Sequence, residues 1–586
     1  MNKKTIITIL LVLVTMAGQA QSPIPESIVD TYWRNEVTGD WEIGFTENCV
    51  IYDCQSWKYN DINEKDGEVV LTLKNGSKTL GITIGKQKGG KCKMTIGKHE
   101  KQTYSLITTR TLPLYPQPDQ TPFIDNGFRE GDSATLIGWI KDYPILKGEN
   151  RKLKVYYRGF ITGENESTIE EMDSIGFFKV KVPIENTQMI TVVIDEDPYI
   201  IESLMEPDDT CFVLFDGKNN KYLYMGKNAR VQNELGAARF QMVFNHESDE
   251  ENLSDVQMQA CIEQCKDVYR INEVKVDSVL ARHPTLSRKY EDVFRMINVS
   301  RMANGILQIS ANSHYKIPQS AIDSMLAEVR KNVRKPYSMW YEFYDFLWMY
   351  LQHAIFSTPR KHDIAEVIEW EFQLADSIFT DPVLRECAKA DRVYGMLDAT
   401  NQPLNKSYLE AANKIQLPAA RNAILAKNAE LIVLQNKPMT FTGLRPSSDI
   451  ADMSDGEKIL RKIIEPYKGK LILMDIWGTW CGPCKEALSH SQEEYERLKD
   501  FGLVYLYLAN NSSDESWKNV IKMYDVTGDN VVHYNLPDEQ QKAVEQYLNV
   551  NAFPTYKLID REGTILDADA DPRNLEKLAK LLEQLK

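Results

Sequence analysis

Cysteine is scarce in this sequence, with nine residues in a chain of 586. So few thiols do not fit the dense disulfide framework of small exported domains, and the odd number leaves at least one of them unpaired. Positive charge is also in deficit, because 69 Lys and Arg stand against 84 Asp and Glu, a formal net charge of −15. Since such a chain repels a phosphate backbone, nucleic acid is not an expected partner.

The N-terminus lacks an apolar run long enough to span a membrane, because Ile6–Met16 is shorter than the ~20 residues that a spanning helix needs. Two lysines precede this run, and Gly18 and Ala20 follow it at the positions that a signal peptidase reads. Residues 1–20 are therefore predicted to be a secretory signal, cleaved near Ala20. No cysteine follows directly, so we expect an exported, acidic protein without a lipid anchor or stable membrane insertion.

The composition is that of a globular protein, with 43% apolar and 26% charged residues. At roughly 100 to 200 residues per domain, the length favours about four compact units. The predicted fold class is a multidomain chain with N-terminal antiparallel β units, a central all-α region and a C-terminal α/β fold. The predicted boundaries are a β meander domain at 21–112, a β-sandwich-like domain at 130–229, a helical domain at 231–436 and an α/β domain at 440–586.

Turn signals delimit the predicted strands of the two β units. In the first unit, Asn75-Gly76 and Gly89-Gly90 separate three apolar runs, as in hairpins. Gly85–Lys91 also has the spacing of a phosphate-binding loop. However, Cys92 replaces the Ser or Thr that binds magnesium, and a strand pattern follows instead of a helix, so we interpret this segment as a hairpin turn. In the second unit, Phe178–Val182 alternates apolar and cationic residues, which is typical of a half-buried strand.

Two features of the helical region are interpreted as packing. Cys261 and Cys265 lie at helical spacing behind a predicted capping box of Ser254 and Gln257, which favours a place in the core over a redox role. Aromatic residues crowd Met339–Phe356, which could form a binding groove or a membrane span, but the charged residues within the run favour a buried helix. Core packing is also predicted for Cys49, Cys54, Cys92, Cys211 and Cys387.

The C-terminal region alternates strand and helix patterns, beginning with a strand at Leu471–Trp477 and a helix at Lys485–Asp500. Further strands are predicted at Leu503–Ala509, Thr555–Ile559 and Thr564–Leu566, and further helices at Trp517–Tyr524 and Leu575–Leu585. After the first strand stands Trp480-Cys481-Gly482-Pro483-Cys484. Two thiols three positions apart at the start of a helix can form a disulfide with little backbone movement. The helix dipole and its free N–H groups stabilise a thiolate at the first of them.

This region, about residues 440–586, resembles a thioredoxin-fold domain. The segment 480–484 matches the thioredoxin motif residue for residue, and Asp475 stands six positions before Cys481, where the family has a buried carboxylate. Phe553-Pro554-Thr555 matches the loop whose cis proline faces the disulfide, and Val520–Tyr547 is similar to the insertion of TlpA-like members. Together with the predicted export, this resembles the TlpA/ResA-like thiol-disulfide oxidoreductases of Gram-negative and related envelopes.

The resemblance implies a periplasmic enzyme that reduces protein disulfides. Cys481 would attack a partner's disulfide as a thiolate, and Cys484, deprotonated with help from Asp475, would resolve the mixed disulfide. Pro554 is expected beside this catalytic pair. The implied substrate-binding residues are Trp480, Phe553, Gly482 and Pro483. The implied partners are disulfide-bonded envelope proteins and a membrane thiol donor of the DsbD type, and no organic cofactor or metal is implied.

Alternatives remain open at this point. A Cys-x-x-Cys pair can be half of a zinc site, although no second pair or histidine cluster accompanies it. The chain could also be an envelope binding or scaffold protein with an accessory redox domain, or it could oxidise or isomerise disulfides. Finally, Ala487 and Ser489 stand where many TlpA-like members carry Glu and Pro, and Glu486 is one position early, which argues against a role in cytochrome maturation.

Overall fold

The computed structural model describes residues 24–585 apart from 124–128, 130, 142–151, 160–164, 195–199, 240, 244–253, 314–316, 333–344, 347, 352, 354–362 and 380. The predicted signal, residues 1–20, lies outside the described residues. The chain forms two compact units, residues 1–357 and 358–586, so the predicted helical domain is divided between them and the other predicted boundaries stay predictions. Within the described ranges, no helix combines the length and apolar character that crossing a membrane requires.

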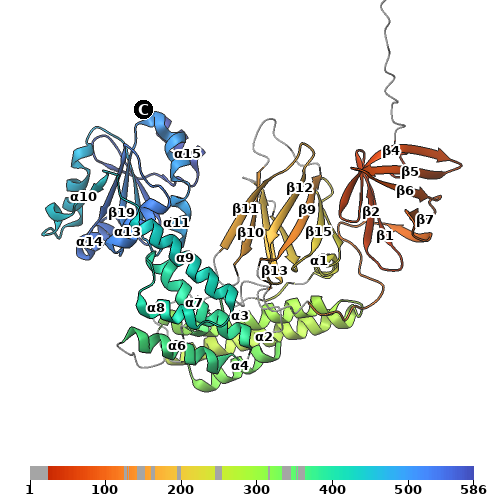
Figure 1. Cartoon of the computed structure of the whole chain (residues 1–586), viewed down its shortest axis with the longest axis horizontal. Coiled ribbons are helices and arrows are strands. Elements are labelled where there is room, and N and C mark those ends of the chain that lie inside the picture. Colours follow the sequence, from red (N-terminus) through yellow and green to blue (C-terminus); the bar gives the residue numbers. More distant parts are fainter. Residues whose placement is uncertain are drawn as a thin grey trace, which may run out of the picture. The chain divides into compact units, whose positions relative to one another are not determined.

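The first eight strands form a closed antiparallel barrel (Figure 1). They are β1 (Thr31–Asn35), β2 (Trp41–Phe45), β3 (Cys49–Tyr52), β4 (Gln55–Lys65), β5 (Glu68–Asn75), β6 (Lys78–Ile84), β7 (Lys91–Ile96) and β8 (Gln102–Leu106). Because β1 pairs with both β2 and β8, the sheet has no free edge, and Trp33 and Phe45 help to fill its core. Gly85–Lys91 is the predicted hairpin turn, in which Gly89 and Gly90 both have positive φ angles.

Two four-stranded sheets follow and share one apolar core, within the range predicted as a sandwich-like domain. The first is ordered β11-β10-β13-β14 and the second β12-β9-β15-β16. Their strands are β9 (Ser133–Lys141), β10 (Lys152–Arg158), β11 (Asn165–Glu171), β12 (Phe177–Pro183), β13 (Gln188–Ile194), β14 (Ile200–Met205), β15 (Thr210–Asp216) and β16 (Lys221–Gly226). The expectation of antiparallel strands alone is wrong for β9 and β15, which are parallel neighbours. The chain between them passes through the facing sheet, and this supplies the long crossover that a parallel pair needs.

Helices complete the first unit, namely α1 (Ala229–Ala237), α2 (Asp255–Arg282), α3 (Arg288–Ser313) and α4 (Gln319–Asn332). Helix α2 begins at the predicted capping box, in which Ser254 and Gln257 satisfy each other's backbone N–H groups. Cys265 is buried as predicted, whereas Cys261 lies half-buried at the edge of the apolar stripe. Most of Met339–Phe356 lies outside the described residues. The core positions predicted for Cys49, Cys54, Cys92, Cys211 and Cys387 are confirmed.

The second unit begins with α6 (Ile364–Ile378), α7 (Pro382–Thr400), α8 (Lys406–Lys414) and α9 (Pro418–Asn436). A six-stranded sheet ordered β17-β20-β19-β18-β21-β22 follows, with β17 (Leu444–Arg445), β18 (Ile472–Trp477), β19 (Val504–Ala509), β20 (Val531–Asn535), β21 (Thr555–Ile559) and β22 (Ile565–Leu566). Strands β18, β19 and β20 are parallel, and β21 is antiparallel to β18. This order confirms the predicted α/β domain.

Helices cover both faces of this sheet. On one face pack α10 (Gly456–Ile464) and α14 (Asp538–Leu548), and on the other α11 (Gly482–Leu488), α12 (Ser491–Leu498), α13 (Asp514–Met523) and α15 (Leu575–Glu583). The predicted single helix Lys485–Asp500 is thus two helices. The break lies at Ser489, whose hydroxyl donates to the carbonyl of Glu486, and the N–H of His490 donates to the carbonyl of Ala487, a tightened last turn that ends α11.

Candidate active site

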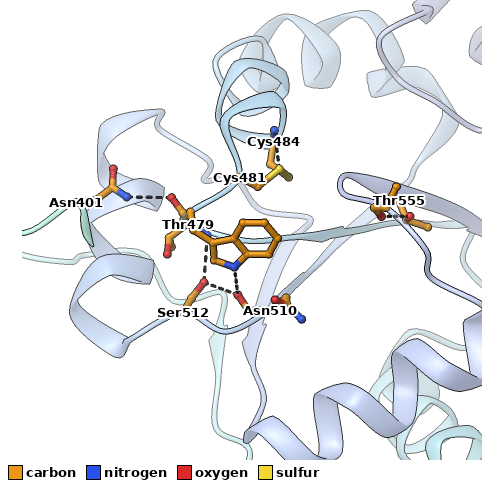
Figure 2. The surroundings of a disulfide bond; sticks show 9 residues. Asn401, Thr479, Cys481, Cys484, Asn510, Ser512 and Thr555 are labelled. Carbon is orange, nitrogen blue, oxygen red and sulfur yellow. Dashed lines mark hydrogen bonds between the residues drawn. A yellow bond between two sulfur atoms is a disulfide. The ribbon is translucent and has the colours of Figure 1, made fainter. Parts of the chain in front are cut away.

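The dithiol pair lies where β18 leads into α11. Cys481 and Cys484 form a disulfide, with their Cα atoms 5.2 Å apart. Cys481 is the N-cap residue of α11, and its Sγ accepts a hydrogen bond of 3.2 Å from the N–H of Cys484 (Figure 2). Gly482 and Pro483 form the first turn between them, where the missing N–H of proline costs no hydrogen bond. A thiolate at Cys481 would therefore be stabilised by the free N–H groups at this helix end.

The remaining predicted binding residues gather beside this pair. Trp480 is 45% exposed, and its ring meets that of Phe553 edge to face, with ring centroids 5.3 Å apart. The indole Nε1 donates to the carbonyl of Asn510, 3.2 Å away, in the connection after β19. The peptide bond between Phe553 and Pro554 is cis, as the resemblance implied, and it lies directly before β21. The site is thus built from the ends of three neighbouring strands.

Gly478 allows the indole of Trp480 to lie against its own backbone. A Cβ atom at position 478 would stand 2.6 Å from Nε1 of Trp480 and 3.2 Å from the carbonyl oxygen of Asn510. This contact cannot be relieved by moving the end of a flexible side chain, because the indole ring is rigid and its Nε1 is hydrogen-bonded. A side chain at position 478 would therefore push Trp480 away from Phe553.

Asp475 lies in the middle of the central strand β18. Successive side chains of a strand point to opposite faces, so Asp475 shares the face of Leu473 and Trp477, the face that carries the core cluster with both cysteines. Its neighbours in the adjacent strands are Tyr507 and Tyr556. Its Oδ1 is buried and has no hydrogen-bond partner among the described residues. Burial, and then the nearby Glu494 and Asp571, raise the pKa of Asp475 well above its ordinary value.

A second buried carboxyl, Glu494 in α12, was not singled out from the sequence. It is 9% exposed, and burial together with Asp571 raises its pKa to about 8. It shares the buried face of α12 with Ser491 and Leu498, and no pattern in the sequence sets it apart from the exposed glutamates of the same helix. Burial is the largest cause of this shift, and it favours the neutral form of the carboxyl.

Next to these carboxyls lies a buried group of aromatic residues. The hydroxyls of Tyr495 and Tyr507 are hydrogen-bonded at 2.7 Å, and the ring of Tyr507 stacks on His533 with centroids 4.7 Å apart. Nε2 of His533 lies 2.9 Å from the carbonyl of Val526, which requires this nitrogen to carry the hydrogen. Burial lowers the pKa of His533 to about 3, so the ring is neutral at physiological pH.

A metal ion bound by a protein is held by several side chains together. Among the residues that the structure describes, no group of three or more His, Cys, Asp or Glu side chains is arranged to hold a metal ion. The site brings together a dithiol that can open and close its own disulfide and a buried carboxyl group.

A dithiol pair at the N-terminal end of α11, the helix that follows β18 in this α/β fold, is the site of a thiol-disulfide oxidoreductase. Residues 469–565 match the family model described as thioredoxin-like, and the C-terminal domain is a TlpA/ResA-like thioredoxin-fold domain. The chain thus contains the domain of a protein-disulfide oxidoreductase.

Individual relatives match the same part of the chain. It is 28% identical over 140 residues to the thiol-disulfide oxidoreductase ResA of Bacillus thuringiensis subsp. konkukian, covering 24% of this chain and 75% of the relative. The ResA of Bacillus subtilis is 29% identical over 103 residues, or 18% of this chain and 54% of the relative. Among solved structures, the thioredoxin domain of a thiol-disulfide oxidoreductase from Bacteroides vulgatus is 22% identical, covers 21% of this chain and 84% of that chain, and has a TM-score of 0.18.

Proposed function

We propose that this chain is an exported reductase of protein disulfides that uses Cys481 as the attacking and Cys484 as the resolving thiol. The observation that carries the assignment is the position of Cys481 at the N-cap of α11, where its Sγ accepts the N–H of Cys484. Cys481 is also the more exposed of the two, at 5% against 1%. The predicted signal at residues 1–20 supports export to the periplasm.

The reaction has two exchange steps. The thiolate of Cys481 attacks one sulfur of a partner's disulfide, forms a mixed disulfide and releases the other partner sulfur as a thiolate. The thiolate of Cys484 then attacks Sγ of Cys481, which closes the Cys481–Cys484 disulfide and releases the second partner thiol. Two electrons pass to the partner, and a membrane thiol donor of the DsbD type reduces the pair again.

Asp475 supports the second step because it is the carboxyl on the face of β18 that carries the cysteines. Its raised pKa brings its basicity closer to that of a thiol, which is a condition for accepting the proton of Cys484. The exposed ring of Trp480 and the adjoining Phe553 give the partner an apolar surface beside the sulfurs.

Trapping of mixed disulfides tests the order of the two thiols. Full-length Cys484→Ser is expected to accumulate mixed disulfides with partner proteins on non-reducing gels, and Cys481→Ser is expected to accumulate none. Mass spectrometry of the trapped species would identify the partners. Equal trapping by both variants would overturn the assignment of attacker and resolver.

The direction of electron flow is tested by equilibration of the full-length protein with glutathione buffers. Gly482-Pro483 matches the dipeptide of reducing thioredoxins, so we expect a potential nearer to the thioredoxin value of about −270 mV than to the DsbA value of about −120 mV. A value near the DsbA end would mean that the protein oxidises or isomerises its partners, and the reductase proposal would be dropped.

A second candidate function is ligand binding by the β units, with the redox domain as an accessory. One observation favours it: the barrel carries an open cavity of about 840 Å³ whose lining includes Lys65, Lys86, Lys88 and Lys91. Insulin reduction distinguishes the two candidates, because an accessory domain would leave the full-length protein without turnover of disulfide substrates.

A further inference from the structure

The C-terminal end of α7 contacts the redox loop on the side before Cys481. Nδ2 of Asn401 donates to the carbonyl of Thr479 at 3.0 Å (Figure 2). The N–H of Thr479 donates in turn to the hydroxyl of Ser512 at 3.1 Å. Asn401 and Thr479 are both buried, and Thr479 stands two positions before Cys481. Both backbone polar groups of the residue that leads into Trp480 and Cys481 are therefore held, one of them by a residue outside the thioredoxin-like domain.

The same helix end contacts the redox loop on the side after Cys484. Nζ of Lys485 donates to Oδ1 of Asp398 at 2.5 Å and lies 3.3 Å from the carbonyl oxygen of Asp398. The side chain of Lys485 is only 10% exposed, whereas that of Asp398 is 47% exposed. Lys485, a buried cation, directly follows Cys484 in the chain, and Asp398 of α7 supplies the carboxylate that faces its ammonium group. Without Asp398, the buried ammonium group of Lys485 would be left without a compensating carboxylate.

Other contacts show that this end of α7 is docked rather than merely adjacent. The backbone of Asn401 is left-handed, with φ 50° and ψ 37°, and its carbonyl accepts a hydrogen bond of 2.9 Å from Nδ2 of Asn519 in α13. Nε2 of Gln402 donates to the hydroxyls of Ser513 and Ser516 at the start of α13, at 2.8 and 3.1 Å. The residues Asp398–Gln402 thereby bridge the redox loop and α13.

The charge of Lys485 is relevant to the dithiol because a cation near a thiol favours the thiolate. Stabilising the reduced, thiolate form makes a dithiol pair more oxidising, and offsetting the cation makes it a better electron donor. Asp398 holds the ammonium group of Lys485 and offsets its charge. This arrangement suits a reductase.

We infer that Asp398–Gln402 is a positioning element of the redox site: Asn401 fixes the loop before Cys481, and Asp398 offsets the charge of Lys485 so that the pair stays reducing. The inference rests on the proposed function and deepens it, since it assigns part of the redox tuning to the helices that precede the thioredoxin-like domain. Neither residue touches a sulfur or a substrate.

The test uses full-length Asp398→Asn, which keeps the shape of the side chain and removes its charge. We expect the equilibrium with glutathione to shift 3- to 10-fold towards the dithiol, where tenfold corresponds to about 30 mV for a two-electron couple. The matched control is Asp376→Asn. Asp376 of α6 is 50% exposed and pairs at 2.7 Å with Lys389 of α7, which is 12% exposed, a similar pairing of an exposed carboxylate with a largely buried cation. The control is expected to shift the equilibrium less than twofold.

A double variant separates charge from disruption. If Asp398 acts through Lys485, Asp398→Asn combined with Lys485→Gln should return the equilibrium towards the wild-type value, because no uncompensated cation remains. A potential of Asp398→Asn equal to that of wild type and of the control would overturn the inference, as would a shift that the double variant does not reduce. If the wild-type protein itself fails to exchange with glutathione or to reduce insulin, the proposed function fails instead.

Discussion

Replacing Glu494 by Gln is expected to remove a loss of stability that the C-terminal domain shows as the pH rises towards about 8. The carboxyl of Glu494 is 9% exposed, and burial and Asp571 raise its pKa from the ordinary 4.5 to about 8. The folded state therefore holds the proton more tightly than the unfolded chain does. The stabilisation that results is fully present below pH 4.5 and is lost as the pH rises through about 8.

The size of the effect follows from the same two values. At about 1.4 kcal/mol for each pH unit, a rise from 4.5 to about 8 corresponds to about 5 kcal/mol between protonated and ionised Glu494. This is a large part of the 5–15 kcal/mol that typically separates folded from unfolded domains. Glu494 also raises the pKa of Asp475, although less than burial does. Removing the charge of Glu494 should therefore lower the pKa of Asp475 as well.

Pulse proteolysis in urea at pH 6 to 9 would measure this effect in the full-length protein. Peptides from β18 and β19 report on the C-terminal domain, so the other domains do not enter the result. Wild-type protein should lose resistance as the pH rises from 6 to about 8 and then level off, whereas Glu494→Gln should lose much less. Glu493→Gln, at the exposed neighbouring position, is the control and should behave as wild type. Parallel losses in wild type and Glu494→Gln would refute the reasoning.

Three further predictions concern the same domain. Asp475→Asn should slow release of the partner more than attack on it, by tenfold or more at neutral pH, as measured by stopped-flow mixed-disulfide kinetics; unchanged turnover would make Asp475 structural. Gly478→Ala should displace the indole of Trp480 and slow insulin reduction several-fold, with a change in tryptophan fluorescence, because its Cβ would stand 2.6 Å from Nε1. His533→Gln should resist acid better than wild type, because the lowered pKa of His533 means that stability is present above about 6.5 and is lost as the pH falls towards 3. Acid unfolding curves that coincide would contradict this last prediction.

The redox pair could be predicted from the sequence because its determinants are local. A strand of apolar residues, two cysteines three positions apart and a proline in the first helical turn all stand within residues 471–484. The same holds for the start of α2, where Ser254 and Gln257 form the capping box that their spacing predicted. Each of these features depends on contacts between residues only a few positions apart.

The features that the sequence did not reveal depend on contacts across long separations. Closure of the barrel requires β1 to pair with β8, and the parallel pairing of β9 with β15 requires the chain to pass through the facing sheet. The burial of Glu494 follows from packing of α12, since its neighbours Glu493 and Glu496 are exposed. The hydrogen bond between Asn401 and Thr479 joins residues 78 positions apart. No local pattern distinguishes these residues from ordinary polar surface residues.

The predicted boundary between the helical domain, 231–436, and the α/β domain, 440–586, is crossed by hydrogen bonds in the structure. Nζ of Lys522 in α13 lies 2.7 Å from the carbonyl of Leu434 and 3.2 Å from that of Gln435, at the C-terminal end of α9. A fragment of residues 440–586 would leave Lys522 without these acceptors and Lys485 without Asp398. Both ammonium groups would then lack these hydrogen-bond acceptors. An uncompensated cation at Lys485, the residue after Cys484, favours the thiolate. The potential of that fragment would then be less negative than that of the intact chain, so redox measurements should retain the helices of the second unit, residues 358–586.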